Sequence, residues 1–191
     1  MRELSQHVLD LIQNSLEAGA SQVEIEIIEN RAANQLTLSV ADNGRGMDEE
    51  TVRRVTDPFY TTRTTRHVGL GLPLLQAAAE RCGGGLIITS RPGEGTRVVA
   101  DFDLDHIDRA PLGDMKDTLI GALLSEKGAD IVYRHRLDDR EMTLDTREIR
   151  EILGEDIPLS HPMVRSWLLG YLDDEFAALY DTASRITHKG V

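Results

Sequence analysis

The chain begins with apolar residues at helical spacing. These residues are Leu4, Val8, Leu11, Ile12 and Leu16. Apolar positions three and four residues apart share one face of a helix, so they predict an amphipathic helix over residues 3–18. Gly19 follows directly and suits the C-terminal end of such a helix.

Strict alternation of apolar and polar residues comes next. Residues 22–28 and 35–41 each place three apolar side chains on one face, which predicts a hairpin with one buried side. A glycine-rich "DNGRGM" follows, and Asp48 is a suitable N-cap for a short helix. Residues 85–90 and 95–103 predict a second hairpin across "RPGEG".

Two segments separate these hairpins. Residues 56–68 have no clean period and are rich in Thr and Arg, which predicts a loop as long as functional lids tend to be. Residues 70–82 begin with glycines, carry Pro73 in the first turn and end in three glycines, which predicts a helix. The fold class is therefore α+β: a two-layer sandwich of a mixed, mostly antiparallel sheet covered by helices on one face.

The pattern of the sequence changes after Asp103. A polar linker leads to a predicted helix over 114–126, a hairpin around Asp138 and Asp139, a helix capped by Asp145, and a final helix over 162–180. We expect this last helix, which contains Trp167, to serve packing and its acidic "LDDEF" to form a solvated face. Residues 1–103 are thus predicted to form one domain, and 104–191 a small α/β C-terminal extension.

Composition and charge narrow the function. The net charge is −12, and residues 101–191 carry most of it, with 20 acidic against 11 basic side chains. An acidic surface argues against a nucleic-acid partner. The first thirty residues contain neither a secretory signal nor a membrane span, and a single cysteine, Cys82, fits a reducing compartment. We therefore expect a cytoplasmic protein with no membrane contact.

Several short segments contain residues suited to ligand binding or catalysis. Asp10 and Asn14 lie four residues apart and so share a helix face. Asn14 offers a neutral oxygen to Mg²⁺. Asp42 is only an acceptor, so it suits the amine of adenine and would repel the carbonyl that guanine presents there. Gly69 and Gly71 expose backbone N–H groups at a helix start, where the helix dipole favours phosphate.

In their order along the chain, these pieces resemble the GHKL nucleotide-binding domain of histidine kinases, gyrase B subunits, MutL and a heat-shock chaperone. "DLIQNSLEAGAS" is most similar to the MutL form of the first box, whereas "DPFYTTR", "GLGLPLL" and "RPGEGTRV" resemble the histidine-kinase branch. One departure is that His67 and Val68 stand where that branch has a leading Gly-x.

The resemblance implies ATP and Mg²⁺ as ligands, with Asn14 as the metal ligand. It implies an ATP site made of these residues: Asn14, Ala18, Asp42, Gly44, Gly46, Met47, Phe59, Arg63, Arg66, Gly69, Leu70, Gly71, Leu72 and Thr96. Asp10 stands where several members have a catalytic Glu. Asp is one methylene shorter, so a general base and a structural role both stay open.

Function follows as an expectation with alternatives. The predicted nucleotide helix begins within the first few residues, which leaves no room before it for the phosphoacceptor helix of a histidine kinase. We expect a stand-alone kinase or ATPase that acts on a protein partner docked through residues 104–191. The alternatives are a nucleotide-gated binding module or anti-sigma-like regulator with little turnover, and a MutL-like dimer. The sequence leaves the oligomeric state open.

Overall fold

The computed structural model describes residues 2–57, 70–123, 128–154 and 157–181. Along the chain its elements are α1 (Leu4–Glu17), β1 (Gln22–Asn30), β2 (Gln35–Asp42), α2 (Glu49–Arg54), α3 (Gly71–Arg81), β3 (Gly85–Arg91), β4 (Gly95–Asp103), α4 (Met115–Leu123), β5 (Asp130–Leu137), β6 (Arg140–Asp145), α5 (Thr146–Leu153) and α6 (Pro162–Tyr180). Every predicted helix and hairpin is confirmed to within a few residues. The predicted loop over 56–68 falls mostly outside the described residues.

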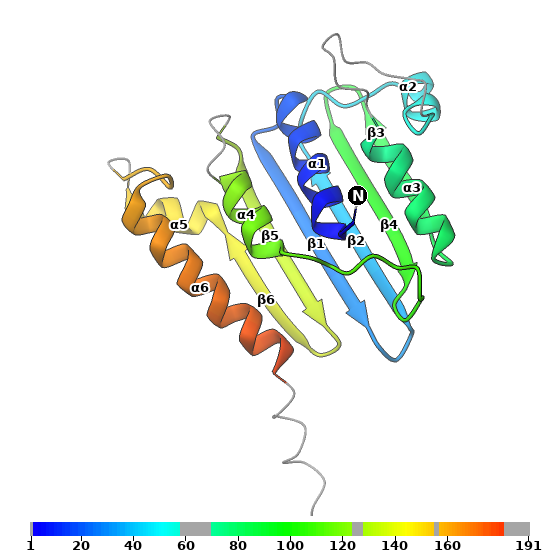
Figure 1. Ribbon diagram of the computed structural model, residues 1–191. Helices are drawn as coiled ribbons and strands as arrows, with labels where there is room; N and C mark the ends of the chain where they lie inside the picture. The colour runs from blue at the N-terminus through cyan, green and yellow to red at the C-terminus, as the bar shows by residue number, and fades with distance from the viewer. Residues whose placement is uncertain (1, 58–69, 124–127, 155–156, 182–191) are drawn as a thin grey trace, which may run out of the picture.

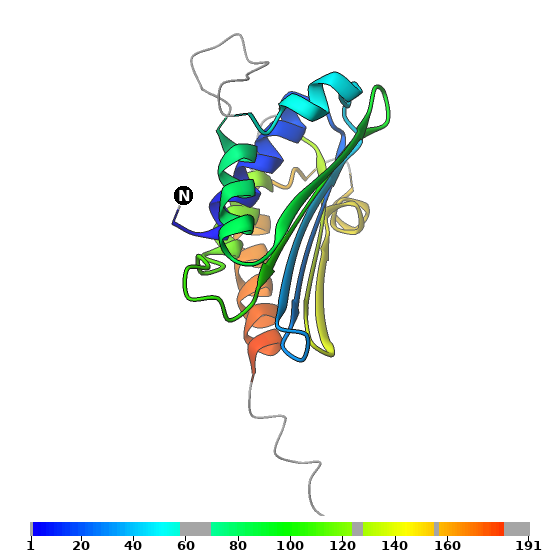
Figure 2. The ribbon, with the colours of Figure 1, turned by 90° about the vertical axis from the view of Figure 1, so that its right-hand side faces the viewer.

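One sheet organises the described chain. Its strand order is β3-β4-β2-β1-β5-β6, and only the β1–β5 pair is parallel. Helices α1, α3, α4 and α6 lie over one face, while α5 lies on the other face beside β5 (Figures 1 and 2). The predicted α+β class with a mixed, mostly antiparallel sheet is confirmed.

The core forms between the sheet and the helices that cover it. On β1 the residues Val23, Ile25 and Ile27 are at most 1% exposed, as the alternation predicts. Helix α1 buries its apolar stripe against them, including Leu4 and Val8 at 0%. At roughly 1.5–3 kcal/mol for each fully buried large aliphatic side chain, this shared layer fixes α1 firmly against the strands.

The sheet continues past residue 103. Strand β5 pairs with β1 in register from Gln22↔Asp130 to Glu29↔Leu137. The connecting segment also packs back, because the backbone N–H groups of Leu4 and Ser5 donate to the carbonyls of Pro111 and Leu112 at 2.9 and 2.8 Å. These carbonyls satisfy N–H groups that the first turn of any helix leaves without partners.

Helix α6 packs against the core, as expected. It packs through Val164, Leu168, Leu172 and Leu179, all at most 7% exposed. Trp167 lies beside this buried stripe, is 54% exposed and stacks on Tyr171 with ring centroids 5.4 Å apart.

Candidate functional site

Helix α1 brings three predicted site residues to one surface. Asp10, Asn14 and Ala18 follow one another at intervals of four and are half-buried. The spacing stacks them along a single helix face. At Asp10 this face meets the start of α3, because a Cβ on Gly71 would overlap the Asp10 carboxylate.

The Asp42 carboxylate lies at the end of β2 and is held from two sides. Ser15 Oγ donates to Oδ2 at 2.9 Å, and the Gly44 N–H donates to Oδ1 at 2.8 Å. Ser15 is 3% exposed, so its hydroxyl is fixed by the packing of α1. A carboxylate has about four acceptor positions, so Asp42 retains acceptors for a ligand amine.

The glycine loop packs against α1 and β3. The Arg45 N–H donates to the Ala18 carbonyl at 3.0 Å, which ties the loop to the end of α1. A Cβ on Gly44 would lie 2.9 Å from the Ala18 Cβ, and one on Gly46 would overlap the Arg91 carbonyl. Gly46 also has a φ of +65°, which side chains disfavour. The glycines at both positions are therefore required by close approach.

Thr96 is brought to the same end of the sheet by strand pairing. Strands β2 and β4 align Asp42 with Thr96. Ser90 on β3 joins them, since its Oγ lies 2.9 Å from Thr96 Oγ1 and accepts from the Met47 N–H at 2.8 Å. The structure thus brings Asp42, Met47 and Thr96 together at one end of the sheet.

The start of α3 completes the arrangement. A Cβ on Gly71 would overlap the Asp10 carboxylate, so this side chain lies directly over the first turn of α3. The N-cap residue Leu70 has no side chain that could accept a capping hydrogen bond. Leu70 is 40% exposed, and Leu72 packs on the core. The shorter Asp10 side chain therefore does reach α3.

Four predicted site residues lie outside the described residues. They are Phe59, Arg63, Arg66 and Gly69. Sequence analysis in turn missed Ser15 and Ser90. Ser15 directly follows Asn14 in "QNSLEAGAS", and Ser90 lies one residue before the end of β3, opposite Thr96. Helix phase and hairpin register were therefore the signals available.

The predicted Mg²⁺ site can be compared with the possible metal-binding side chains in the structure. Among residues 2–57, 70–123, 128–154 and 157–181, no three His, Cys, Asp or Glu side chains group closely enough to hold a metal ion. Asn14 fits a Mg²⁺ ion that takes most of its ligands from water and phosphate, because Mg²⁺ keeps several waters and shares few protein ligands.

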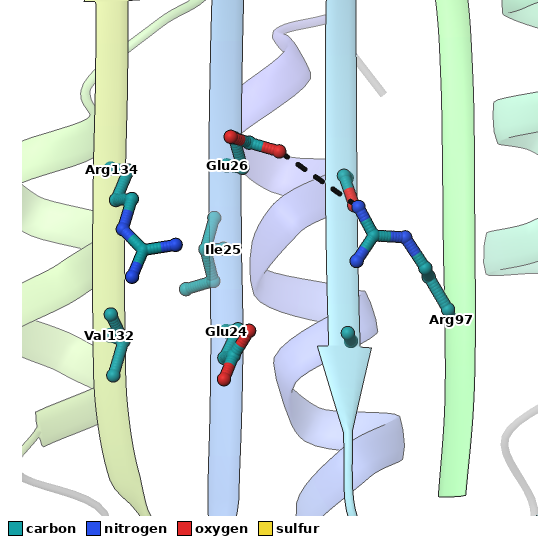
Figure 3. Close-up of a pocket in the computed structure, with 8 residues that line it drawn as sticks. Glu24, Ile25, Glu26, Arg97, Val132 and Arg134 are labelled. Atoms are coloured by element: carbon teal, nitrogen blue, oxygen red, sulfur yellow. Dashed lines mark ion pairs between the residues drawn. The ribbon is translucent and has the colours of Figure 1, made fainter. Parts of the chain in front are cut away.

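A separate shallow pocket lies on the opposite face of the sheet. Glu24, Glu26, Arg97 and Arg134 surround it, and Arg97 Nη2 lies 3.9 Å from Glu26 Oε2 (Figure 3). The strands separate this pocket from α1, whose helix lies behind them in the view. It is therefore no part of the Asp42 site.

The fold and site define a class of protein: an α+β domain whose first helix, glycine loop and α3 converge at one end of the sheet. A family model described as Histidine kinase-, DNA gyrase B-, and HSP90-like ATPase matches residues 1–106. The chain belongs to this family, as its motifs predict. In the described part of the chain, no helix has the length and apolar character needed to cross a bilayer.

Individual relatives match just over half of the chain. A putative sensor protein of Shewanella frigidimarina is 38% identical over 109 residues, which are 56% of this chain and 17% of that protein. The sensor protein kinase FleS of Pseudomonas aeruginosa is 40% identical over 110 residues, 58% of this chain and 27% of that protein. The chain therefore spans less than a third of the length of these relatives.

A solved structure shares the fold over a longer stretch. The crystal structure of the N-terminal domain of a DNA repair protein gives a TM-score of 0.52 at 16% identity. The match covers 81% of this chain and 58% of that one, so it extends past the first 106 residues.

Proposed function

We propose that this chain binds Mg²⁺–ATP at the Asp42 site and acts as a kinase or ATPase on a protein partner. The observation that carries the proposal is the fixed Asp42 carboxylate, held by Ser15 and Gly44 at the place where α1 and the glycine loop meet. An acceptor-only group in that position favours adenine over guanine. ATP is expected to bind more tightly than GTP.

Calorimetry with Mg²⁺–ATP tests this binding step. Asp42→Asn replaces an acceptor by a donor amide and removes a charge-assisted hydrogen bond worth about 1.5–3 kcal/mol, so affinity should fall roughly ten- to a hundredfold. Asp101→Asn is the matched control, because Asp101, like Asp42, accepts two hydrogen bonds but lies at the other end of the sheet. Unchanged affinity in Asp42→Asn contradicts the assignment.

Asn14 and α3 are assigned to the phosphates. Asn14 would hold Mg²⁺, and the N–H groups at the start of α3 would bind the phosphate oxygens. Arg63 and Arg66 remain proposed phosphate contacts, and Phe59 and Gly69 remain proposed parts of the site. Asp10 stands over the first turn of α3, where it can accept a proton from an attacking nucleophile.

The four histidines that the structure describes are poorly placed to be the phosphoacceptor. His7 and His135 are 4% and 0% exposed, so their rings are too deeply buried to contact a catalytic site. His106 and His161 accept backbone N–H groups at Nδ1, at 3.1 and 3.3 Å. In a neutral ring the proton then sits on Nε2, so that nitrogen is not nucleophilic.

We also propose that residues 104–191 contact the partner. Met163 and Trp167 on α6 are 75% and 54% exposed, and large apolar side chains exposed together on one helix mark interaction sites. Incubating the chain with γ-labelled ATP in cell extract separates the alternatives. A labelled partner indicates a kinase, and free phosphate indicates an ATPase.

A nucleotide-gated binding module is the second candidate. The contact between Asp10 and α3 favours it, because a carboxylate at a helix N-terminus stabilises the helix without any chemistry. In that case ATP binds, but neither free phosphate nor a labelled protein accumulates above the level of a sample without the chain.

A further inference from the structure

Strand β3 ends the sheet with an unprotected edge. It is the terminal strand in the order β3-β4-β2-β1-β5-β6. Figure 2 turns this edge toward the viewer, with α3 on one side of the strand and α2 near its Arg91 end. In the chain that the structure describes, no further strand pairs with β3 there.

The sequence of β3 lacks the usual protection of sheet edges. Natural edges carry Pro, Lys or a bulge that prevents pairing with another chain. "GLIITSR" has no proline and places its one charge, Arg91, at the end. Ile87 is 63% exposed on the face of the sheet away from α3. The edge thus carries an apolar, largely β-branched stretch at Leu86, Ile87 and Ile88, and no charge before Arg91.

Charge is distributed unevenly along this edge. Arg91 lies at one end, and its only ion pair among the described residues is with Glu94 at 3.5 Å, where both side chains are well exposed. At the other end, Gly85 pairs with Asp101 on β4. Both Asp101 hydrogen bonds, from Gln35 and Thr37, go to Oδ1. One end is therefore basic and the other acidic.

We propose that β3 pairs antiparallel with β3 of a second copy of this chain, centred on Ile88, to make one continuous sheet across a two-fold axis. This register sets Ile87 opposite Thr89 of the second copy and Arg91 opposite Gly85. Directly opposed residues in an antiparallel pair point to the same face. Isologous pairing makes each contact occur twice.

This register brings opposite charges of the two copies together. Gly85 has no side chain, and a Cβ built there would meet no atom within 4 Å. Arg91 of the second copy can extend over this gap toward Asp101, which lies one strand further, about 4.8 Å across the sheet. Elsewhere the net charge of −12 opposes self-association. The two Arg91–Asp101 contacts favour a second copy over an uncharged peptide strand.

Light scattering with size-exclusion chromatography tests the pairing in the full chain. We expect a concentration-dependent dimer, and Ile87→Lys should raise its dissociation constant at least about tenfold, since a charge on the edge blocks strand pairing. Ile152→Lys is the control, because Ile152 is 84% exposed on α5 and lies away from this edge. A monomer at all concentrations, or an unaffected dimer in Ile87→Lys, overturns the proposal.

Charge reversal gives a second test that does not depend on folding losses. Arg91→Glu and Asp101→Arg should each weaken the dimer roughly tenfold, because each places like charges together at both contacts. Mixed in equal amounts they should restore it. In the mixed dimer one contact joins the two substituted side chains with their charges exchanged, and the other joins the original Arg91 and Asp101. If the mixture stays as weak as either variant alone, this register is wrong.

Discussion

Ser15 Oγ lies 2.9 Å from Asp42 Oδ2 and donates to it, which links helix α1 to the end of strand β2. The same hydroxyl lies 3.1 Å from the Leu11 carbonyl, so the serine is oriented by its own helix. Ser15, which directly follows the proposed metal ligand Asn14, therefore orients the Asp42 carboxylate, the proposed acceptor for adenine. A change at Ser15 should affect ATP binding although Ser15 itself need not touch the nucleotide.

We predict that Ser15→Ala weakens ATP binding about three- to tenfold, the equivalent of one neutral hydrogen bond of roughly 0.5–1.5 kcal/mol. Asp42 would keep the Gly44 N–H but lose its fixed orientation. Titration calorimetry measures the change. Ser5→Ala on the same helix, where Ser5 is also 3% exposed, should leave affinity unchanged. Equal effects of both variants would mean that the loss comes from α1 stability.

The elements could be predicted because their patterns are local. Alternation on β1 and the i, i+4 stripe on α1 each need only neighbouring residues. Asp42, Gly44 and Thr96 could be placed in one site because the family resemblance supplies their common ligand. Asp10 over Gly71 could not be predicted, since it depends on how far α3 approaches α1.

The pairing of β5 with β1 could likewise not be predicted from the sequence. Nothing in "DIVYRHRL" indicates that it pairs parallel with β1, because any apolar strand fits beside another. The exposure of Trp167 could not be predicted for a related reason, since only the position of α6 on the sheet decides which face of that helix is covered.

Asp10→Asn is predicted to leave ATP affinity within about threefold and to abolish phosphate release or transfer, because the amide cannot accept the proton of a nucleophile. Gly71→Ala should act on the same group from the other side, since the new methyl must push the Asp10 carboxylate away. Single-turnover assays on labelled ATP measure both. Turnover at the wild-type rate in Asp10→Asn would leave Asp10 a structural role only.

His7 is predicted to make the fold sensitive to acid. Burial, and secondarily the positive N-terminus, lower the pKa of His7 to about 4 from its usual 6.5. Its Nδ1 is buried without a hydrogen-bond partner among the described residues. The unfolded chain therefore binds a proton between pH 6.5 and 4 that the folded chain resists, so stability falls as pH falls through that range.

Urea unfolding at several pH values measures this dependence. The His7 contribution to the slope should approach about 1.4 kcal/mol per pH unit, which is the free energy of one pKa unit. His7→Leu should flatten the curve between pH 6.5 and 4, whereas His106→Gln should leave the His7 slope in place. An unchanged slope in His7→Leu would assign the acid sensitivity to other groups.

The boundary at residue 103 leads to a prediction about fragments. Strand β5 covers the edge of β1, and the 104–114 segment provides the carbonyls that cap α1. A fragment of residues 1–106 should therefore melt well below the full chain and aggregate through the bare β1 edge. Circular dichroism and light scattering measure this. A fragment with the melting temperature of the full chain would support two independent domains.

A polar cluster joins α6 to β1 at the far end of the sheet from Asp42. Tyr180 donates to Glu29 Oε1 at 2.5 Å, and the same oxygen lies 2.9 Å from His135 Nε2. Tyr133 Oη lies 2.9 Å from His135 Nδ1. Since a carboxylate can only accept, His135 carries its proton on Nε2 and accepts from the Tyr133 hydroxyl at Nδ1.

Tyr180→Phe is predicted to destabilise the fold by about 1 kcal/mol, at the low end for a hydrogen bond to a charged group because Tyr180 is 40% exposed.

Burial and the bond to Glu29 raise the pKa of Tyr180, so the tyrosine contribution to stability is lost as pH rises above about 10. Burial raises the pKa of Glu29, but the bonds from His135 and Tyr180 outweigh it and lower the pKa overall. The Glu29 contribution is therefore lost as pH falls below its unfolded value of 4.5. Urea unfolding of Tyr180→Phe should show less loss at both extremes, and a curve parallel to that of the unaltered chain would show that Tyr180 does not hold α6 to β1.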